Sequence, residues 1–382
     1  MAATIQILPE PLANKIAAGE AVQRPANVVK ELIENSIDAG STMVTVVINN
    51  GGKTLIQVID NGIGMSSEDA KIAFSRHATS KIKTYEDLEA IRTLGFRGEA
   101  LAAISAVAQV ELKTRMAESE LGTLVHVEGG SMTNVGPCAA SKGTSILMRN
   151  LFYNTPGRRH FLKSEATEFK HISDVIQRAA ISYPEVAMEF ISDGEVIMDL
   201  QPATPAGRVK DIFGEKLYGT LFSLEEGSEL MSVTGFLGRP DFARKSRIEQ
   251  YLYLNRRYII NRNINHAVFQ AYEHLLEKGS FPFFILSLTV NPKKVDVNVH
   301  PTKMEVKFDD EGSIYRSVVS LVRKSLSSHD LVPSVGMREA TSNDEHMGLR
   351  FTTSVEIPEL RTTPWGTLLH SPQSNPGGMA AG

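Results

Sequence analysis

Hydrophobic residues recur at helical spacing in the segment VVKELIENSIDAG, which covers residues 28–40. The apolar positions are Val28, Leu32, Ile33 and Ile37. They would form one stripe along a helix, and the closing glycine suits a left-handed C-terminal cap. Glu31, Asn35 and Asp38 follow at i, i+4 and i+7, so they lie on one side of the same helix. A solvated helix face would explain these polar positions, and a functional role depends on partners elsewhere in the chain.

An alternating pattern follows this helix. Residues 44–48 and 55–59 are typical of paired strands, because Asn49-Asn50-Gly51-Gly52 between them favours a hairpin turn. The second strand would bring Asp60 to its end. Further strands are predicted at residues 110–112, 123–127, 143–147, 188–191, 196–200, 231–237, 251–254 and 283–290. Helices are predicted at residues 11–19, 66–75, 98–107, 208–213, 264–278 and 313–327, with one more ending near residue 181.

Length and composition indicate a soluble globular chain with two domains. Its 382 residues are 42% hydrophobic and 22% charged, as in ordinary globular proteins. Residues 202–207 are rich in proline and glycine, so we expect a first domain over residues 1–207 and a second over 208–330. Periodicity is lost beyond residue 333, which predicts a disordered linker or tail over residues 331–382.

The same composition narrows the function classes. No apolar run approaches the roughly 20 residues of a membrane span, and the first residues lack the features of a secretory signal. The single cysteine, Cys138, excludes a disulfide framework and a cysteine-rich metal site. We therefore expect a cytosolic protein without a membrane partner. The net charge of −4 means that any nucleic-acid contact must come from local patches.

Two glycine-rich segments carry the candidate chemistry. The P-loop pattern is absent, because Val47 stands where its first glycine should be. Asp60-Asn61-Gly62-Ile63-Gly64 follows a strand, and such an aspartate can accept a hydrogen bond from the adenine amine while the glycines admit the base; a plain turn would also explain it. The run Gly95-Phe96-Arg97-Gly98-Glu99-Ala100-Leu101 opens a helix, whose N-terminus is a natural phosphate site. Thr79-Ser80-Lys81 adds two hydroxyls and an ammonium from a loop.

These motifs resemble those of a known ATPase superfamily. Glu31-x-x-x-Asn35, Asp60-x-Gly62-x-Gly64, GFRGEAL and Gly143-Thr144 are similar to the four motifs shared by gyrase, the heat-shock chaperone ATPase, sensor histidine kinases and MutL. The runs FSRHATSKI, LGFRGEALAAISAV, LFYNTPGRRHFLKS and VDVNVHPTKMEVKF resemble the MutL family of DNA mismatch repair ATPases in particular. The similarity extends over residues 5–326.

The resemblance implies a fold and a set of roles. The fold would be α+β, with a mixed-sheet α/β sandwich ATPase domain followed by a smaller ribosomal-protein-S5-like α/β domain. Glu31 would be the general base for the attacking water, Asn35 the Mg²⁺ ligand, and Lys303 the lysine that reaches the γ-phosphate from the second domain. Asp60, supported by Thr144, would bind adenine beside Gly62 and Gly64. The lid over the ATP phosphates would comprise Thr79, Ser80, Lys81, Phe96, Arg97, Gly98, Glu99, Ala100 and Leu101.

Two basic clusters are candidates for DNA contact, although solvated surfaces would also explain them. They contain Arg256, Arg257 and Arg262 in the second half, and Arg158 and Arg159 in the first. Such patches neutralise phosphates without reading bases, so binding would be independent of sequence.

The resemblance further implies an ATP-dependent homodimer that closes as a clamp, in which residues 8–19 become ordered. Its partners would be the mismatch-recognition protein MutS and a downstream nuclease or helicase, in the cytoplasm at the nucleoid. The resemblance also implies a C-terminal dimerisation domain beyond a linker, in which some family members carry an endonuclease motif, so neither endonuclease activity nor constitutive dimerisation is expected from these residues. Two other interpretations remain open, an ATP-switched adaptor in which hydrolysis is incidental and a gyrase-type topoisomerase subunit.

Overall fold

The computed structural model describes residues 18–19, 21–84, 86–87, 91, 93–246, 249–297 and 304–329. These residues belong to one compact unit built around two β-sheets. Within the described ranges, no helix combines the length and the apolar character that crossing a bilayer requires.

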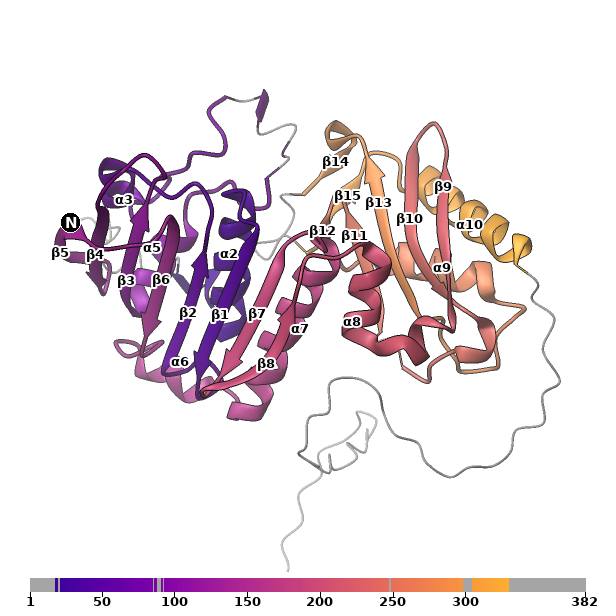
Figure 1. Ribbon diagram of the computed structural model, residues 1–382. Helices are drawn as coiled ribbons and strands as arrows, with labels where there is room; N and C mark the ends of the chain where they lie inside the picture. Colours follow the sequence, from indigo (N-terminus) through magenta and orange to yellow (C-terminus); the bar gives the residue numbers. More distant parts are fainter. Residues whose placement is uncertain are drawn as a thin grey trace, which may run out of the picture. The chain divides into compact units, whose positions relative to one another are not determined.

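The first sheet has eight strands in the order β5-β4-β3-β6-β2-β1-β7-β8 (Figure 1). The strands are β1 (Met43–Asn49), β2 (Leu55–Asp60), β3 (Gln109–Arg115), β4 (Gly122–Glu128), β5 (Ser131–Cys138), β6 (Gly143–Arg149), β7 (Ala187–Ser192) and β8 (Glu195–Leu200). Neighbouring strands are antiparallel except β1 and β7, which run parallel, so the sheet is mixed. The register places Thr144 on β6 opposite Asp60 on β2.

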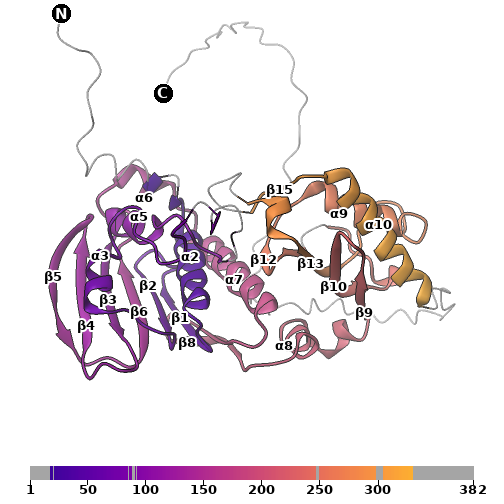
Figure 2. The same cartoon turned by 90° about the horizontal axis from the view of Figure 1, so that it is seen from above.

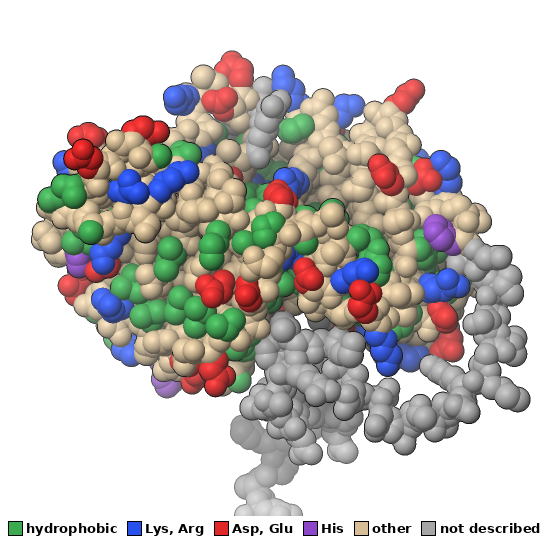
Figure 3. Space-filling model, viewed as in Figure 1, with side chains coloured by type: hydrophobic (Ala, Val, Ile, Leu, Met, Phe, Trp, Pro, Cys, Tyr) green, Lys and Arg blue, Asp and Glu red, His purple; other side chains and the backbone are tan. Residues whose placement is uncertain are grey.

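Helices cover one face of this sheet, as Figure 2 shows. They are α2 (Pro25–Asp38), α3 (Ser67–Ile72), α5 (Ala100–Val107), α6 (Pro156–Phe161) and α7 (Glu165–Ser182). Leu32 and Ile33 of α2 are buried, and so are Val46 and Ile48, which alternate with more exposed residues along β1. The opposite face carries no helix, and hydrophobic side chains gather on it (Figure 3). We therefore expect a functional site on the side covered by helices, along the polar edge of α2.

The second sheet has five strands in the order β12-β11-β13-β10-β9. They are β9 (Leu221–Gly227), β10 (Met231–Gly238), β11 (Gln250–Leu254), β12 (Arg257–Tyr258) and β13 (Phe284–Val290). The helices of this part are α8 (Pro205–Tyr218), α9 (Arg262–Tyr272) and α10 (Glu311–Ser328). Shorter elements are η1 (Pro240–Phe242), η2 (Pro292–Lys294), β14 (Val295–Asp296) and β15 (Lys307–Phe308).

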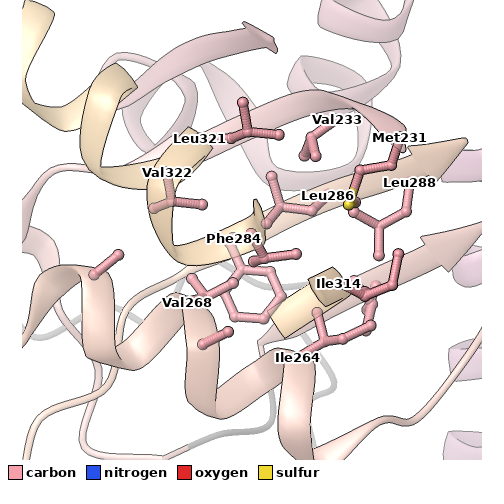
Figure 4. Packing of buried hydrophobic residues seen from close by; sticks show 14 of the residues in the cluster. Met231, Val233, Ile264, Val268, Phe284, Leu286, Leu288, Ile314, Leu321 and Val322 are labelled. Carbon is pink, nitrogen blue, oxygen red and sulfur yellow. The ribbon is translucent and has the colours of Figure 1, made fainter. Parts of the chain in front are cut away.

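Both faces of this second sheet are covered, which explains why residues 284–286 at the start of β13 are apolar without interruption. Phe284, Leu286 and Leu288 pack with α9 and α10 (Figure 4). Phe283 and Ile285 belong to a second cluster that includes α8. Successive side chains of a strand point to opposite faces, so a strand buried on both sides has no polar alternation.

The second cluster also contains Ile181 of α7, so it joins the two sheets' helical layers. Gln177 of α7 donates to the Tyr251 hydroxyl at 3.0 Å, and the Tyr253 hydroxyl donates to the carbonyl of Arg178 at 3.0 Å. Arg208 of α8 is fully buried and donates through Nη2 to the carbonyls of Pro184, Val186 and Gln201. Apolar packing and two side-chain hydrogen bonds therefore tie the second sheet to α7, and Arg208 ties α8 to the segments that follow α7 and β8.

Most predicted elements are present, with identifiable differences. The helix predicted at 264–278 ends at Tyr272, and the one predicted from residue 98 begins at Ala100. The elements that were not predicted are β5, β9, α6, the two-residue strands β12, β14 and β15, and the short helices η1 and η2. Only residues 18–19 of the helix predicted at 11–19 are described. The tail predicted at 331–382 lies entirely outside the described residues. The division at residues 202–207 stays a prediction, and α8 begins there with Thr204 as its N-cap.

Candidate active site

The polar side of α2 faces the glycine-rich segment around Gly95. Asp38, whose side chain is 7% exposed, accepts hydrogen bonds from the backbone N–H groups of Leu94 and Gly95, both at 2.9 Å. Its Oδ2 also lies 2.6 Å from Lys81 Nζ. The sequence motifs assign no chemistry to Asp38. In the structure it fixes the start of the candidate phosphate loop, which comprises residues 93–99.

Lys81 links the candidate lid to the candidate metal ligand. Its Nζ donates to Asn35 Oδ1 at 2.7 Å while it forms the ion pair with Asp38. Two hard oxygen atoms of α2, Asn35 Oδ1 and Asp38 Oδ2, therefore hold the same ammonium group. Oxygen donors of this kind suit Mg²⁺, which commonly uses only one or two protein ligands and takes water and phosphate oxygens for the rest. Among the described residues, no cluster of three His, Cys, Asp or Glu side chains that could hold a metal occurs.

Asp60 ends β2 beside the C-terminal half of α2. Ser36 donates to its Oδ2 and the Gly62 N–H to its Oδ1, each at 2.9 Å. Burial raises the pKa of Asp60 above the ordinary aspartate value, although hydrogen bonds, chiefly from Gly62 and Ser36, act in the opposite direction. Each carboxylate oxygen has two lone pairs, so the group can still accept a hydrogen bond from an exocyclic amine.

Thr144 approaches this carboxylate from β6, and a residue that sequence inspection missed holds it there. Thr114 of β3 is fully buried. Its Oγ1 bonds the Gly143 carbonyl at 3.1 Å and lies 3.0 Å from Thr144 Oγ1. It also accepts the N–H of Met65 at 2.9 Å. Thr114 therefore joins β3 and β6 to the glycine turn after β2.

The glycines at this site are required by neighbouring backbone. A Cβ on Gly64, which has φ +72°, would lie 2.2 Å from the Arg115 carbonyl oxygen. A Cβ on Gly143 would lie 2.0 Å from the Asp60 carbonyl oxygen, and one on Gly62 would lie 2.8 Å from that of Ala39. The sequence interpretation gives Gly62 and Gly64 the role of leaving space for a base. The close approach of the neighbouring backbone is by itself sufficient to require glycine at both positions.

The GFRGEAL run forms the turn into α5. Phe96 is buried, and Gly98, at φ +62°, would place a Cβ 2.5 Å from the carbonyl oxygen of Ala78. Glu99 is the N-cap of α5 and lies 3.5 Å from His77 Nδ1. The first turn of the helix starts with Ala100 and Leu101, and the Arg97 guanidinium lies over the Phe96 ring.

The loop of residues 76–83 thus contacts this turn. Thr79 Oγ1 accepts the N–H of Lys81, and Ser80 is exposed. Together with Lys81, these contacts bring the two predicted lid segments to one side of α2.

Glu31 lies one turn before Asn35 on the same helix, with a side chain 19% exposed. Its Oε1 is 3.3 Å from Lys30 Nζ, which also pairs with Glu34 at 2.7 Å. Burial alone would lower the pKa of Lys30, but the charges of Glu34 and Glu31 raise that pKa above the ordinary lysine value. Glu31 is therefore a partly accessible carboxylate within an ion-pair cluster. Lys303 lies outside the described residues.

The predicted DNA-contacting arginines do not share one environment. Arg159 and Arg262 are exposed, and Arg158 is partly buried with its guanidinium over the Phe152 ring. Arg256 forms an ion pair with Glu185 and lies over the ring of Tyr183. Arg257 is only 7% exposed and donates through Nη2 to the carbonyl of Thr93 at 2.9 Å. That burial argues against the DNA contact predicted for Arg257.

The residues that sequence inspection overlooked are Ser36, Asp38 and Thr114. Asp38 belongs to the polar side of the recognised helix, so its position was a usable signal, whereas Ser36 lies four residues after Leu32 on the buried side. Thr114 has no such signal, because a single threonine in a strand is ordinary.

Comparison with known proteins agrees with this architecture. Residues 23–131 match the family of histidine kinase-, DNA gyrase B-, and HSP90-like ATPases, and residues 209–327 match the C-terminal domain family of DNA mismatch repair proteins. Both matches confirm the predicted α+β fold class, an ATPase domain followed by a mismatch-repair domain.

Individual relatives are similar over most of this chain. A DNA mismatch repair protein MutL from Christiangramia forsetii is 47% identical over 333 residues, which cover 87% of this chain and 54% of the relative. A MutL from Chlorobaculum tepidum is 48% identical over 328 residues, or 86% of this chain and 53% of the relative. The chain thus spans about half the length of the curated relatives it matches.

Solved structures share the fold. The Aquifex aeolicus MutL ATPase domain complexed with ADP is 28% identical, with a TM-score of 0.54 over 71% of this chain and 93% of that one. The N-terminal domain of a DNA repair protein superposes with a TM-score of 0.69 over 83% of this chain and 97% of that one, at 24% identity. The second likeness concerns the fold alone.

Proposed function

The chain belongs to the MutL family of DNA mismatch repair proteins, and on that premise we propose that it binds and slowly hydrolyses ATP with Mg²⁺. The observation that carries the proposal is the convergence of two features on α2. Asp60, a half-buried carboxylate, accepts a hydrogen bond from Ser36 on this helix. On the same turn of the helix, Asn35 and Asp38 hold the ammonium of Lys81.

Asp60 would recognise the adenine amine, since its oxygens are fixed by Ser36 and Gly62 and retain free lone pairs. Thr144, held by Thr114, would support the same edge of the base from β6. The ADP complex of the related Aquifex aeolicus domain supports a nucleotide at the corresponding site.

Asn35 would hold Mg²⁺ through Oδ1, the atom that receives Lys81 in this structure. The metal ion supplies positive charge beside the phosphate oxygens when it is bound. Lys81 would then turn from Asn35 to the phosphates. The turn around Gly98 and the first N–H groups of α5 would bind the same phosphates, together with Thr79 and Ser80.

Glu31 would act as the general base that orients and deprotonates the attacking water. Its ion pair with Lys30 holds the carboxylate on the side of α2 that carries Asn35. Lys303 would contribute the second cation at the γ-phosphate, as the family resemblance implies.

We further propose that ATP closes two copies of this region into a clamp on DNA, in the cytoplasm at the nucleoid. The clamp would couple MutS to a downstream nuclease or helicase. Arg256 and Arg262 in the second half, and Arg158 and Arg159 in the first, would neutralise DNA phosphates. Arg257 is left out of this set because it is buried.

Replacing Glu31 by alanine tests the catalytic assignment. We expect at least a hundredfold lower ATP turnover with nucleotide affinity within threefold of wild type, because a general base contributes about 10²–10⁴ to rate. Turnover and the binding of a fluorescent ATP analogue would be measured together, with Glu165→Ala on α7 as the control. Full turnover in Glu31→Ala would refute the assignment. Repair activity surviving in a variant that binds ATP without hydrolysing it would favour the adaptor alternative.

Charge reversal at Arg262, Arg262→Glu, tests the DNA assignment. We expect weaker DNA binding for all sequences and a shallower dependence of log K on log salt, by about 1–2 units, since at least one phosphate contact is lost. Fluorescence anisotropy with two unrelated duplexes at several salt concentrations measures both quantities. An unchanged affinity and slope would remove Arg262 from the DNA-binding set.

A further inference from the structure

The turn that joins β11 to β12 is held rigidly in an unusual conformation. Its two central residues, Asn255 and Arg256, both have positive φ, at 48° and 68°. Such a turn normally favours Asn-Gly, so an arginine there is strained unless its surroundings fix it. Asn255 supplies the anchor, because its side chain bonds both the N–H and the carbonyl of Val290 on β13. The residue after the turn, Arg257, therefore starts from a fixed backbone position.

Arg257 uses that position to reach the ATPase domain. Its Nη2 donates to the Thr93 carbonyl at 2.9 Å, across 164 residues of sequence. The side chain is buried, and its Nη1 has no hydrogen-bond partner among the described residues. Removing a guanidinium from water in this way costs desolvation free energy, so the contact that Arg257 makes must offset that cost.

The acceptor of this hydrogen bond begins the candidate phosphate loop. Thr93 Oγ1 donates to the Gly95 carbonyl at 2.6 Å, and Asp38 accepts the N–H groups of Leu94 and Gly95. Three consecutive residues are thus tied from two sides. Asp38 holds them from α2, and Arg257 holds them from the second sheet.

Joining the domains does not by itself require Arg257. The cluster around Ile181 and Phe283 packs α7 against the second sheet, and the Gln177–Tyr251 and Arg178–Tyr253 hydrogen bonds reinforce it. Arg257 is distinguished from these contacts by its partner. The others end on α7, whereas Arg257 ends on the loop.

We propose that Arg257 is a positioning residue, which couples the second domain to the phosphate-binding loop by holding the Thr93 carbonyl. The inference rests on the nucleotide site proposed above. A shift of the β11–β12 turn would move the backbone of residues 93–95, and with it the N–H groups that lead into the phosphate turn. By linkage, nucleotide bound at that loop would also strengthen or weaken the Arg257 contact.

The test uses the full chain and two readouts. In Arg257→Lys, amide hydrogen exchange at Leu94 and Gly95 without nucleotide should be about tenfold faster, the ratio that corresponds to about 1.4 kcal/mol. The affinity for a non-hydrolysable ATP analogue should fall about three- to tenfold. Thr93→Val, which removes only the hydroxyl bond to Gly95, should give less than an additive effect when combined with Arg257→Lys. Arg257→Gln replaces Arg257→Lys if the lysine variant does not fold.

Tyr251→Phe is the matched control, because it removes the hydrogen bond between α7 and β11 without touching the loop. It should leave exchange at Leu94 and Gly95 and nucleotide affinity within twofold of wild type. Equal effects in Tyr251→Phe and Arg257→Lys would overturn the proposal, and so would unchanged exchange in Arg257→Lys. A wild-type chain that binds no nucleotide would refute the proposed function instead, while the exchange measurement would still decide whether Arg257 positions the loop.

Discussion

Replacing Asp38 by asparagine removes one negative charge and one acceptor at the point where α2 meets the candidate phosphate loop. The carboxylate uses Oδ1 for the Leu94 N–H and Oδ2 for both the Gly95 N–H and Lys81 Nζ. Asparagine has one oxygen, so its NH₂ group must face a donor on one side. The backbone of residues 94–95 would lose at least one hydrogen bond, and Lys81 would lose its ion pair while it keeps its hydrogen bond to Asn35.

The magnitude follows from these contacts. A hydrogen bond to a charged group contributes about 1.5–3 kcal/mol. The ion pair is partly buried, with Asp38 7% and Lys81 18% exposed, so it falls between a surface pair at about 0–1 kcal/mol and a broken buried pair at about 3–5 kcal/mol. We therefore expect the loop to open more easily by about 3 kcal/mol, which is on the order of a 100-fold change in the opening equilibrium.

Native-state hydrogen exchange at Leu94 and Gly95 measures this opening directly. The free energy of unfolding from urea denaturation should fall by less than the local value, because the loop can open without the sheets. Asp199→Asn on the exposed edge strand β8 is the control for the same chemical change, and its effect should stay within about 0.5 kcal/mol. Exchange within twofold of wild type in Asp38→Asn would refute the role assigned to Asp38.

Two further predictions concern β2 and β6. Burial raises the pKa of Asp60 in the folded chain, so its contribution to stability is fully present below the unfolded pKa and is lost as pH rises through the folded pKa. The free energy of unfolding of wild type minus that of Asp60→Asn should therefore fall with rising pH over that interval in urea titrations. If this free-energy difference rose with pH, the reasoning would be contradicted. Nucleotide affinity should also drop in Asp60→Asn at neutral pH. Gly143→Ala should lower the free energy of unfolding by about 3 kcal/mol or more, since φ is +108° and the Cβ would lie 2.0 Å from the Asp60 carbonyl oxygen. Gly136→Ala on β5, with no atom within 4 Å of its Cβ, should change it by less than about 0.5 kcal/mol, and equal losses would refute the steric argument.

The elements that the sequence predicted share a strong local pattern. Helix α2 buries Leu32 and Ile33 at the expected spacing, and Gly40 adopts the left-handed conformation at φ 69° that its position indicated. The hairpin of β1 and β2 turns through Asn50, Gly51 and Gly52, all at positive φ. Hydrophobic period and turn chemistry act over a few residues, so a single chain reveals them.

The missed elements lack that pattern. β5 is an edge strand of the first sheet, and its first four residues are all exposed. β9 is an edge strand of the second sheet and fully buries only Leu224. α6 has no buried residue, so it shows no apolar stripe. Such elements are specified by pairing with a neighbour or by a turn, and their own side chains carry little information.

The sequence by itself determined the helix and the strand end that present Glu31, Asn35 and Asp60, because these residues occur in motifs whose spacing is local; the chemistry of the three side chains stays a prediction. Only the tertiary structure decided what surrounds them. Asp38 reaches residues 56 and 57 positions away, and Arg257 reaches Thr93 across 164 residues. A hydrogen bond between segments so far apart depends on how two sheets and their helices pack, and packing leaves no periodic trace in the chain. For that reason Arg257 was grouped with surface arginines from its sequence, and its burial against the phosphate loop emerged only from the fold.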